Sequence, residues 1–597
     1  LDLYAAADIP ETESFGASGF DLPGVFYDEA AMKKSGKPDP LMYKFASSAA
    51  HTSGKTLVSS ESMTWLGEHF KVALSQMKPD IDQLFTMGIN HIVFQGTAYS
   101  PPDAKWPGWQ FYAAVEFCPQ NTWWRDFQGM TAYIARIQSF LQQGAPDGDA
   151  LLYWPVHDVW YSADGLEKQF SMHNSAEWLR GNGFGEAALL MQSRGYQYDY
   201  ISDRLLDGVK VATDGMLQAG KGTWRTLVVP KSRFMPPATM EKILALARNG
   251  ATVIFVGAPP ADAPGFKDFV ARRAKLVKLE QDAGLTGKAA ASGEVKLGKG
   301  KALIGGDLDL LLTRAGARRE RITDNGAKFI REKLPDGYVY FISNFGREQI
   351  KDMVRFATPA KSAVIFDPLT GAAGVASMRI AGARNSDIFV QLLPGQSLIL
   401  RTYEKETVRD AAWPYYEPFG AAYSISTHWK VEFTEGGPEL PPPAYLEQLS
   451  SWTDFGGKGA KYFSGTARYT KEFILPEIPA QEWMIDFGRV AESARVKLNG
   501  HDLGILWSGP FVARIAPGIM KPAGEVNRLE VEVTNLMANR VIQLDKKMSP
   551  WKIFYDINVV DIGYKPFDAS KWEPLESGLI GPVVLIPVFD PMVAEKK

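Results

Sequence analysis

The pattern of apolar residues changes partway along this chain of 597 residues. Over residues 1–285, short apolar runs alternate with stretches in which apolar residues recur at helical spacing, which predicts strand–helix units on parallel sheets. From residue 286 onward, apolar residues recur at every second position between Gly, Pro and Asn turns, which predicts antiparallel β-structure. A chain of this length exceeds what one hydrophobic core supports, so we expect a multidomain protein that combines α/β and all-β domains.

Four domains are predicted from these patterns. Strand–helix units in the first domain are the repeating unit of a (β/α)8 barrel, and a complete barrel would need chain before Leu1. The second domain has a doubly wound order like that of amidotransferases, but it lacks a nucleophile elbow and is expected to be structural. The predicted domains are residues 1–145, the C-terminal part of the barrel; 146–285, the amidotransferase-like α/β domain; 286–410, a β-sandwich; and 425–597, a jelly-roll.

Aromatic side chains make up 12% of the chain, including 16 Trp, and the formal net charge is -3. This charge provides no electrostatic attraction for nucleic acid. Aromatic rings stack on the apolar face of a sugar, so the composition favours a carbohydrate ligand, although tryptophans also fill β-sandwich cores. Cys118 is the single cysteine, so an intrachain disulfide is excluded and we expect a buried apolar thiol.

Glu61 is the first candidate catalytic residue. It lies in TLVSSESMTW, where an apolar strand ends in small Ser residues and Trp65 follows four positions later. Cleavage of a glycosidic bond needs two carboxyl groups at one cleft, and the carboxyl end of a parallel barrel strand is where such groups are placed. The alternative is that Glu61 caps the helix that follows.

A pair of carboxylates lies near the start of the chain. The segment LDLYAAADIPETE is expected to be an apolar strand that runs into a polar loop, and Glu11 and Glu13 alternate there. In an extended segment, alternate side chains point to the same side. Two such carboxylates can bind hydroxyls, hold a hard cation such as calcium or share a proton, whereas an exposed loop pair would have no role.

Polar and aromatic residues follow the next predicted strand, in HIVFQGTAYSPPDAKWPGWQFY. Tryptophans in a Pro- and Gly-rich loop are harder to bury than those in strands, so a sugar-binding wall is favoured over packing. For the histidine that opens the strand, a hydrogen-bonded structural role is the alternative. His157 and Asp158 could bind a metal or substrate, but a lone His–Asp pair is weak support. The residues of interest in the loop and its strand are His91, Gln95, Tyr99, Trp106 and Trp109.

Three segments, in the same order, resemble the α-L-rhamnosidases of glycoside hydrolase family 106: ADIPETESFG, VSSESMTWLGEHF and GINHIVFQGTAYSPPDAKWPGWQFYAA. Near the C-terminus, IDFGRVAESARVKLNGHDLGILWSGPF and VTNLMANRV resemble the galactose-binding-like β-sandwich of that family and of β-galactosidases. Because this last module is widely shared, it supports a carbohydrate enzyme more than it supports rhamnose. The resemblance implies the C-terminal portion of a family 106 enzyme.

This resemblance implies an inverting hydrolase that releases terminal α-L-rhamnose from rhamnosylated glycans or plant glycosides. It also implies a calcium ion, whose ligands the sequence does not identify. By resemblance, Glu61 is the general base that activates water, and the general acid lies on an earlier barrel strand unless Glu11 or Glu13 takes that role. The residues expected to line the sugar site are Glu11, Glu13, Trp65, His91, Gln95, Tyr99 and Trp106.

Two alternatives stay open: a β-galactosidase-like hydrolase of another glycoside, and a non-catalytic carbohydrate-binding scaffold. No apolar run is long enough to span a bilayer, and residues 1–30 carry no signal-peptide pattern. The chain opens abruptly, so we expect that Leu1 is not the natural start and that an N-terminal remainder of the enzyme is missing. The resemblance implies a periplasmic or secreted location.

Overall fold

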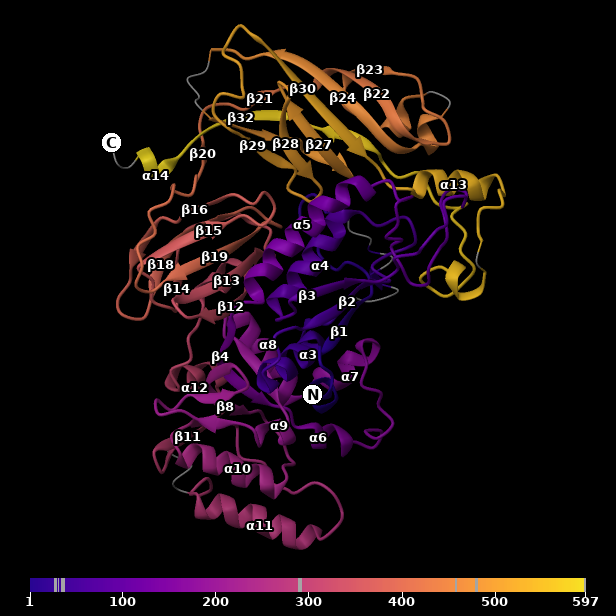
Figure 1. Ribbon diagram of the computed structural model, residues 1–597. Helices are drawn as coiled ribbons and strands as arrows, with labels where there is room; N and C mark the ends of the chain where they lie inside the picture. The colour runs from indigo at the N-terminus through magenta and orange to yellow at the C-terminus, as the bar shows by residue number, and fades with distance from the viewer. Residues whose placement is uncertain are drawn as a thin grey trace.

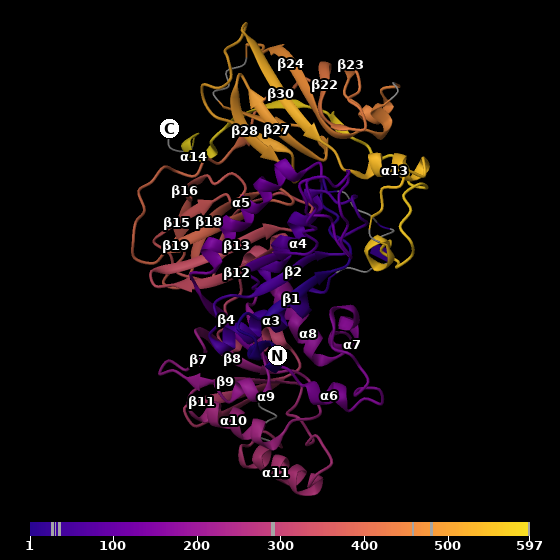
Figure 2. The same ribbon diagram turned by 45° about the vertical axis from the view of Figure 1, so that its right-hand side comes forward.

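The computed structural model describes residues 1–25, 29, 32–33, 38–287, 293–456, 459–477, 482–553 and 555–594. Its secondary structure combines α/β units with many β-sheets. The N-terminal unit occupies the middle of the molecule, and an α/β unit, a β-sandwich and a C-terminal β module lie around it (Figure 1, Figure 2). In the part of the chain that the structure describes, no helix is long and apolar enough to cross a membrane.

The central unit is a sheet of three parallel strands in the order β1-β2-β3, with a helix after each strand. Neighbouring parallel strands joined through a helix are the repeating unit of α/β folds. Among the described residues, these strands form no closed barrel. The elements are β1 (Glu11–Phe15), α3 (Pro40–Ser53), β2 (Ser59–Thr64), α4 (Leu74–Thr86), β3 (His91–Phe94) and α5 (Trp124–Leu141).

The strand expected at the start of the chain is wrong. Helix α1 (Asp2–Ala6) forms there, and β1 begins only at Glu11. The alanine-rich sequence DLYAA favours a helix, and Pro10 disfavours helical backbone at the residue before it. The two glutamates that were expected in a polar loop therefore lie in the strand itself.

The three helices of the central unit pack against the neighbouring domains, and α5 contacts both the β-sandwich and the C-terminal module (Figure 2). Helix α3 packs against the second sheet, where Lys44 Nζ donates to Asp199 Oδ1 at 2.9 Å. Helix α4, which the helical spacing of the sequence predicted, is buried along its whole length, and Lys78 Nζ donates to the carbonyl oxygen of Gly395 at 2.8 Å. On α5, Asp126 accepts hydrogen bonds from two side chains of the C-terminal module. These contacts hold the central sheet in place from one side.

The second sheet has parallel strands in the spatial order β5-β4-β8-β9-β11, and apolar clusters cover both of its faces. An antiparallel strand, β10, extends this sheet beyond β11. Residues 294–305 therefore lie in the α/β sheet, although the sequence analysis placed them in the β-sandwich. The elements are β4 (Ala145–Tyr153), α8 (Gly183–Arg194), β5 (Tyr198–Ile201), β8 (Gly222–Val229), α10 (Pro237–Arg248), β9 (Thr252–Val256), α11 (Phe269–Asp282), β10 (Glu294–Leu297), β11 (Gly300–Gly305) and α12 (Leu308–Arg314).

The β-sandwich continues the second sheet, because β12 pairs with both β4 and β13. Its larger sheet faces a three-stranded sheet of order β14-β18-β17 across a buried apolar cluster. Along β18 every second residue is buried, as the alternation predicted, whereas β13 and β19 are buried on both faces. The strands are β12 (Ala327–Leu334), β13 (Gly337–Asn344), β14 (Ile350–Phe356), β15 (Ser362–Phe366), β16 (Ala373–Val375), β17 (Met378–Ile380), β18 (Ser386–Leu392) and β19 (Ser397–Tyr403).

The C-terminal module contains a six-stranded, a five-stranded and a two-stranded antiparallel sheet, and its core includes three buried tryptophans, Trp429, Trp452 and Trp483. Part of the high tryptophan content thus fills a β-sandwich core. The elements are β20 (Glu417–Pro418), β21 (Tyr423–Ser424), β22 (Thr427–Gly437), β23 (Ala444–Gln448), β24 (Ser464–Ile474), β25 (Glu482–Asp486), β26 (Arg489–Ala491), β27 (Ser493–Leu498), β28 (His501–Leu506), β29 (Val512–Ile515), β30 (Val526–Thr534), α13 (Ala538–Lys546), β31 (Gly578–Gly581) and β32 (Val584–Phe589).

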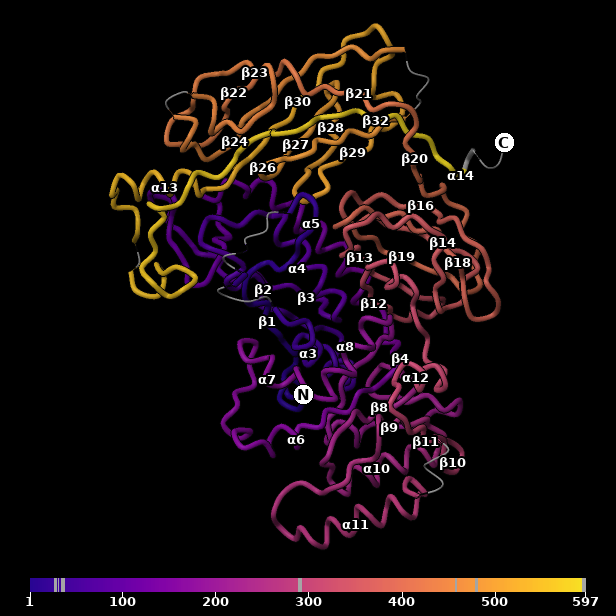
Figure 3. The backbone as a smooth tube through the Cα atoms, turned by 180° about the vertical axis from the view of Figure 1, so that it is seen from behind, coloured from indigo at the N-terminus to yellow at the C-terminus, as the bar shows by residue number. Residues whose placement is uncertain are grey.

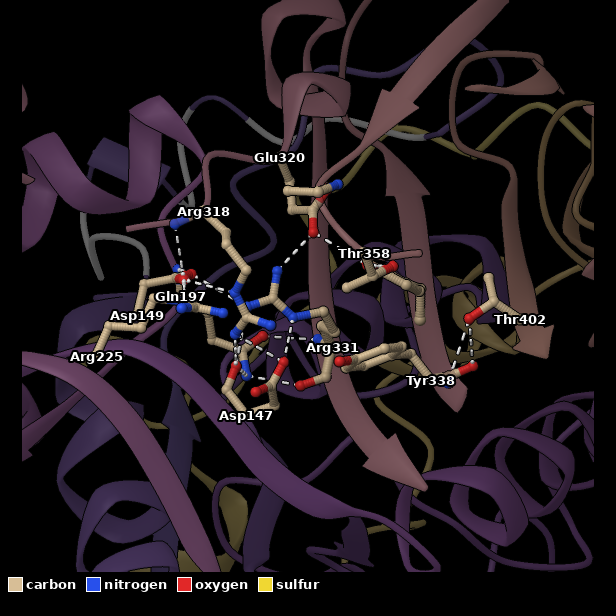
Figure 4. Close-up of polar contacts among 12 residues, drawn as sticks. Asp147, Asp149, Gln197, Arg225, Arg318, Glu320, Arg331, Tyr338, Thr358 and Thr402 are labelled. Carbon is tan, nitrogen blue, oxygen red and sulfur yellow. Dashed lines mark hydrogen bonds and ion pairs between the residues drawn. The ribbon is translucent and has the colours of Figure 1, made fainter. Parts of the chain in front are cut away.

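A buried network of charged side chains joins the second sheet to the β-sandwich (Figure 4). Arg331 of β12 has no solvent exposure, and its guanidinium contacts Asp147 at 2.9 Å, Asp149 at 3.2 Å and Glu320 at 2.5 Å. Arg318 contacts both aspartates, at 2.8 Å and 3.2 Å. Burial raises the pKa of Asp147, but the two arginines outweigh it and leave that pKa below its usual value. The network therefore depends on the pairing of every buried charge.

Glu332, beside Arg331, should make folding stability depend on pH. Its side chain is buried with Oε2 unpaired within the described part of the chain, and burial raises its pKa from 4.5 to about 8. Above pH 4.5 the unfolded chain releases a proton that the folded protein keeps. The stability that Glu332 contributes therefore falls as pH rises from 4.5 to about 8 and is lost above it. We expect Glu332→Gln to remove a slope of about 1.4 kcal/mol per pH unit in this window. Urea unfolding at pH 5 and at pH 8 measures it, and equal slopes in both proteins would contradict the prediction.

Candidate active site

Glu13 and Glu61 lie side by side on the central sheet. Strands β1 and β2 pair in parallel, with Glu13 opposite Glu61. Residues paired in this way project to the same face, with strand backbones about 4.8 Å apart. Ser14, the next residue along β1, points to the other face and donates to Asp80 Oδ2 of α4 at 2.7 Å. The two carboxylates therefore project from the face of the sheet opposite to that helix.

The two carboxylates differ in their surroundings. Burial raises the pKa of Glu13, and the negative charge of Glu61 raises it further. Glu61 is half-buried and accepts a hydrogen bond from Thr64 Oγ1 at 3.3 Å. A carboxyl group whose pKa is raised by burial and by a neighbouring carboxylate is suited to donate a proton. The alternative role for Glu61, as a helix cap, is wrong because Glu61 lies within β2.

A row of polar residues lies beneath this pair. Ser59 is in register with Glu11 on one side and with His91 on the other, and Ser59 Oγ donates to Glu11 Oε2 at 2.7 Å. Glu11 is exposed and His91 is half-buried. This row precedes Glu13 and Glu61 by two residues on each strand, which is about 6.6 Å toward the strand starts.

The end of β2 and the loops beyond β2 and β3 contain non-glycine residues with left-handed backbone. Such conformations cost on the order of 1–3 kcal/mol each and gather at functional sites. Their concentration makes the carboxyl edge of the central sheet a candidate functional edge. These residues are Met63 (φ 71°), Trp65 (φ 50°), Phe70 (φ 60°), Ala113 (φ 52°) and Glu116 (φ 63°).

A buried His–Glu pair, not predicted from the sequence, connects these loops. His69 Nδ1 lies 2.9 Å from Glu116 Oε1, and His69 Nε2 lies 3.1 Å from the carbonyl oxygen of Val560. A carbonyl oxygen only accepts, so Nε2 carries a hydrogen and Nδ1 shares a further proton with Glu116. Burial raises the pKa of Glu116, and His69 opposes that rise. His69 and Glu116 are 47 positions apart, so no local pattern indicated their contact.

The aromatic residues predicted to line the sugar site lie in different surroundings. Trp65 is 1% exposed, so its ring supports the loops and does not face solvent. The guanidinium of Arg540 covers one face of Trp106, 3.9 Å from the ring centre. Tyr99 is 81% exposed. Of these three residues, only Tyr99 has a largely open side chain.

Gln95 and Tyr112 lie at the carboxyl end of β3. The backbone N–H of Gln95 donates to the carbonyl oxygen of Ser62, and Gln95 Nε2 donates to the carbonyl oxygen of Tyr112 at 3.2 Å. Burial and then the phenol of Tyr564 raise the pKa of Tyr112 to about 12, and the charge of Glu13 adds to the rise. Tyr112 is therefore close enough to Glu13 for the charge of that carboxylate to affect its pKa. No sequence pattern indicated Tyr112 as a site residue.

The remaining candidates have structural partners. Cys118 is buried, and burial raises the pKa of its thiol to about 11, which confirms the expected buried thiol. His157 Nε2 contacts Asp203 Oδ2 at 3.1 Å, and Asp158 accepts from the backbone N–H of Arg233 at 2.8 Å. Within the described ranges, no group of three or more His, Cys, Asp or Glu residues could hold a metal ion.

Two carboxyl groups side by side on a sheet of parallel strand–helix units, beside aromatic loops, are the arrangement that a glycosidase needs. The chain belongs to the alpha-L-rhamnosidase family, glycoside hydrolase family 106, whose family model matches residues 31–380. The matched range includes Glu61 and begins after Glu13.

A rhamnosidase structure from Novosphingobium sp. PP1Y is similar to the whole chain, with a TM-score of 0.74 and 23% sequence identity over 98% of this chain and 51% of that one. At this identity the likeness concerns the fold. A protein of Formosa agariphila, provisionally named a beta-glucuronidase, is 27% identical over 335 residues, which are 55% of this chain and 25% of that protein. The chain thus spans about half the length of the rhamnosidase and a quarter of the second protein.

Proposed function

We propose that this protein is an inverting hydrolase that releases terminal α-L-rhamnose from rhamnosylated glycans or plant glycosides. The adjacency of Glu13 and Glu61 on the central sheet carries the proposal of a glycosidase, and the inverting outcome rests on the family resemblance. Membership of the alpha-L-rhamnosidase family supports the choice of sugar. A periplasmic or secreted location is part of the same proposal and rests on the class of substrate.

Glu61 is the proposed general base and Glu13 the proposed general acid. A group that donates a proton near neutral pH needs a raised pKa, which burial and Glu61 provide to Glu13. Glu61 takes a proton from the water that attacks the anomeric carbon. Glu13 gives its proton to the leaving oxygen as the glycosidic bond breaks. The products are free rhamnose and an alcohol, and the enzyme regains its starting state when a proton passes from Glu61 to Glu13.

The other sugar-lining residues are proposed from their places around this pair. Glu11 and His91 lie in the row beneath the carboxylates, and Gln95 lies at the carboxyl end of β3. Their polar groups are suited to sugar hydroxyls, whereas Trp65 and Trp106 hold the loops and Tyr99 extends into solvent.

The domain assignments beyond the plain architecture also belong to the proposal. Three consecutive parallel strand–helix units are what a (β/α)8 barrel repeats, and catalytic residues of such barrels lie at the carboxyl ends of the strands. The two facing antiparallel sheets at the C-terminus fit a galactose-binding-like module. The α/β unit that contains β4 and β8 is proposed to be structural.

Calcium is proposed from the family resemblance alone. A calcium ion takes roughly six to eight oxygen ligands. Glu13 and Glu61 bring two carboxylates together, and among the described residues no group of three or more His, Cys, Asp or Glu side chains could hold a metal ion. These residues do not by themselves make a calcium site, so no step of the proposed reaction uses the ion.

A panel of p-nitrophenyl glycosides tests the sugar, and proton NMR of the first-formed product tests the stereochemistry. We expect the α-L-rhamnoside to be cleaved with β-L-rhamnose appearing first, and the β-galactoside and β-glucuronide to be left intact. Inverting enzymes hold their carboxyl groups roughly 6.5–9.5 Å apart, so the side chains of Glu13 and Glu61 must diverge from strands about 4.8 Å apart. Retention of the anomeric configuration would mean that Glu13 and Glu61 supply an acid and a nucleophile. Binding of the sugar without cleavage would favour a non-catalytic carbohydrate-binding scaffold.

A further inference from the structure

One segment of the C-terminal module reaches the carboxyl edge of the central sheet. Between α13 and β31, the chain leaves the module and passes beside the N-terminal unit (Figure 1, Figure 3). Two hydrogen bonds join it to the loop after β2: His69 Nε2 donates to the carbonyl oxygen of Val560 at 3.1 Å, and the backbone N–H of Ile562 donates to Glu68 Oε2 at 3.2 Å. The segment is therefore docked on the loops that border Glu13 and Glu61.

Apolar contacts reinforce this docking. Val560 and Ile562 are 9% and 7% exposed, and they pack with Trp65 and Ala113 in one small cluster. The partly buried rings of Phe15 and Tyr112 lie against the same cluster. Burial of apolar area here stabilises the position of the segment on the active face.

The tip of the segment is a tight turn that presents Tyr564. Asp561 Oδ1 accepts from the backbone N–H groups of Gly563 at 2.7 Å and Lys565 at 3.0 Å. The N–H of Tyr564 donates to the carbonyl oxygen of Asp561 at 2.8 Å. Tyr564 itself has a left-handed backbone with φ of 58°, which is uncommon for an aromatic residue and persists only when its surroundings impose it.

The ring of Tyr564 is supported from within and open toward solvent. Its hydroxyl lies 2.9 Å from the hydroxyl of Tyr112, and its ring centre is 6.2 Å from that of Trp65. Trp65 is 1% exposed, whereas Tyr564 is 53% exposed. Tyr112 in turn is held by Gln95 at the end of β3 and is close enough to Glu13 for that charge to affect its pKa. Tyr564 is thus linked through Tyr112 to Gln95 at the carboxyl end of β3.

We propose that Tyr564 and Tyr112 form an aromatic subsite that binds the leaving-group part of the glycoside, either a second sugar ring or an aryl ring. This inference rests on the proposed function. An enzyme that removes a terminal sugar holds that sugar at the carboxylates, so the remainder of the substrate extends outward past the rim. A half-exposed tyrosine backed by a buried tryptophan offers a rigid face on which the C–H side of a sugar, or an aromatic ring, stacks. The C-terminal module thereby completes the substrate site.

Steady-state kinetics of Tyr564→Ala in the full-length protein test the subsite. The substrate is a rhamnosyl disaccharide or an aryl α-L-rhamnoside, and free L-rhamnose, which fills only the terminal-sugar site, serves as a competitive inhibitor. We expect kcat/KM to fall roughly tenfold, a typical weight for one stacked ring, while the inhibition constant of L-rhamnose stays the same. Tyr564→Phe should keep most of the activity, because it keeps the ring.

Tyr445→Ala is the matched control, since Tyr445 is 80% exposed on β23 of the same module. It should leave all constants unchanged. An unchanged kcat/KM in Tyr564→Ala would overturn the proposal, and so would a parallel change in the L-rhamnose constant, which would assign Tyr564 to the terminal-sugar site. If the wild type cleaves a different glycoside, the proposed choice of sugar is wrong. The subsite is then tested by comparing the wild type and Tyr564→Ala on that glycoside, with its free sugar as the inhibitor.

Discussion

Glu61→Gln is expected to lower kcat for aryl α-L-rhamnoside by about a hundredfold or more, because general-base catalysis contributes on that order. The glutamine keeps the size of the side chain and can still accept from Thr64, which lies 3.3 Å away in the wild type. The melting temperature should therefore stay close to that of the wild type. Initial rates and thermal unfolding of both proteins measure the two parts of this prediction, and wild-type rates in the variant would exclude Glu61 as the base.

Glu13→Gln distinguishes the two carboxylates. A general acid matters most when the leaving group is poor, so this variant should lose activity on alkyl rhamnosides and retain much of it on dinitrophenyl rhamnoside. The Glu61 variant should lose activity on both, since the attack of water is needed in each case. Equal losses on both substrates in the Glu13 variant would remove Glu13 from the acid role and leave it as a residue that binds substrate.

Arg331→Met is expected to destabilise the folded protein by about 3–5 kcal/mol, because removal of one partner leaves buried charge uncompensated. Arg331 is fully buried and contacts Asp147, Asp149 and Glu320 (Figure 4). Methionine fills part of the space but neutralises none of these carboxylates. Urea unfolding at pH 7 measures the loss.

Arg355→Met is the matched control for the buried network. Arg355 contacts Asp387 at 2.8 Å on the surface of the β-sandwich, where its side chain is 55% exposed. Water solvates a charge left there, so its loss should leave the unfolding midpoint almost unchanged. Similar midpoints in the Arg331 and Arg355 variants would contradict the role assigned to burial.

The sequence by itself determined the local features of the site. The pattern predicted that Glu61 follows an apolar strand ending in small Ser residues, whereas β2 begins at Ser59, after that apolar run, and Glu61 lies within it. Alternation predicted that Glu11 and Glu13 point to one side, and both lie in β1. Helical spacing predicted α4, and period-two alternation predicted the sheets that follow. These features depend on residues close in sequence, where propensity and periodicity act. The same local reasoning failed at α1, where an apolar run was read as a strand although its alanines favour a helix.

Only the tertiary structure decided which distant residues meet. The register of β1 and β2 sets Glu13 beside Glu61, and a shift of one residue would have turned one of them to the helical face. His69 meets Val560 across 491 positions, and Tyr112 meets Tyr564 across 452. Such contacts follow from the docking of one domain on another, and the free energy of that docking is spread over many buried side chains. No local pattern carries this information, so the sequence determined the strands and helices and the packing of the domains assembled the site.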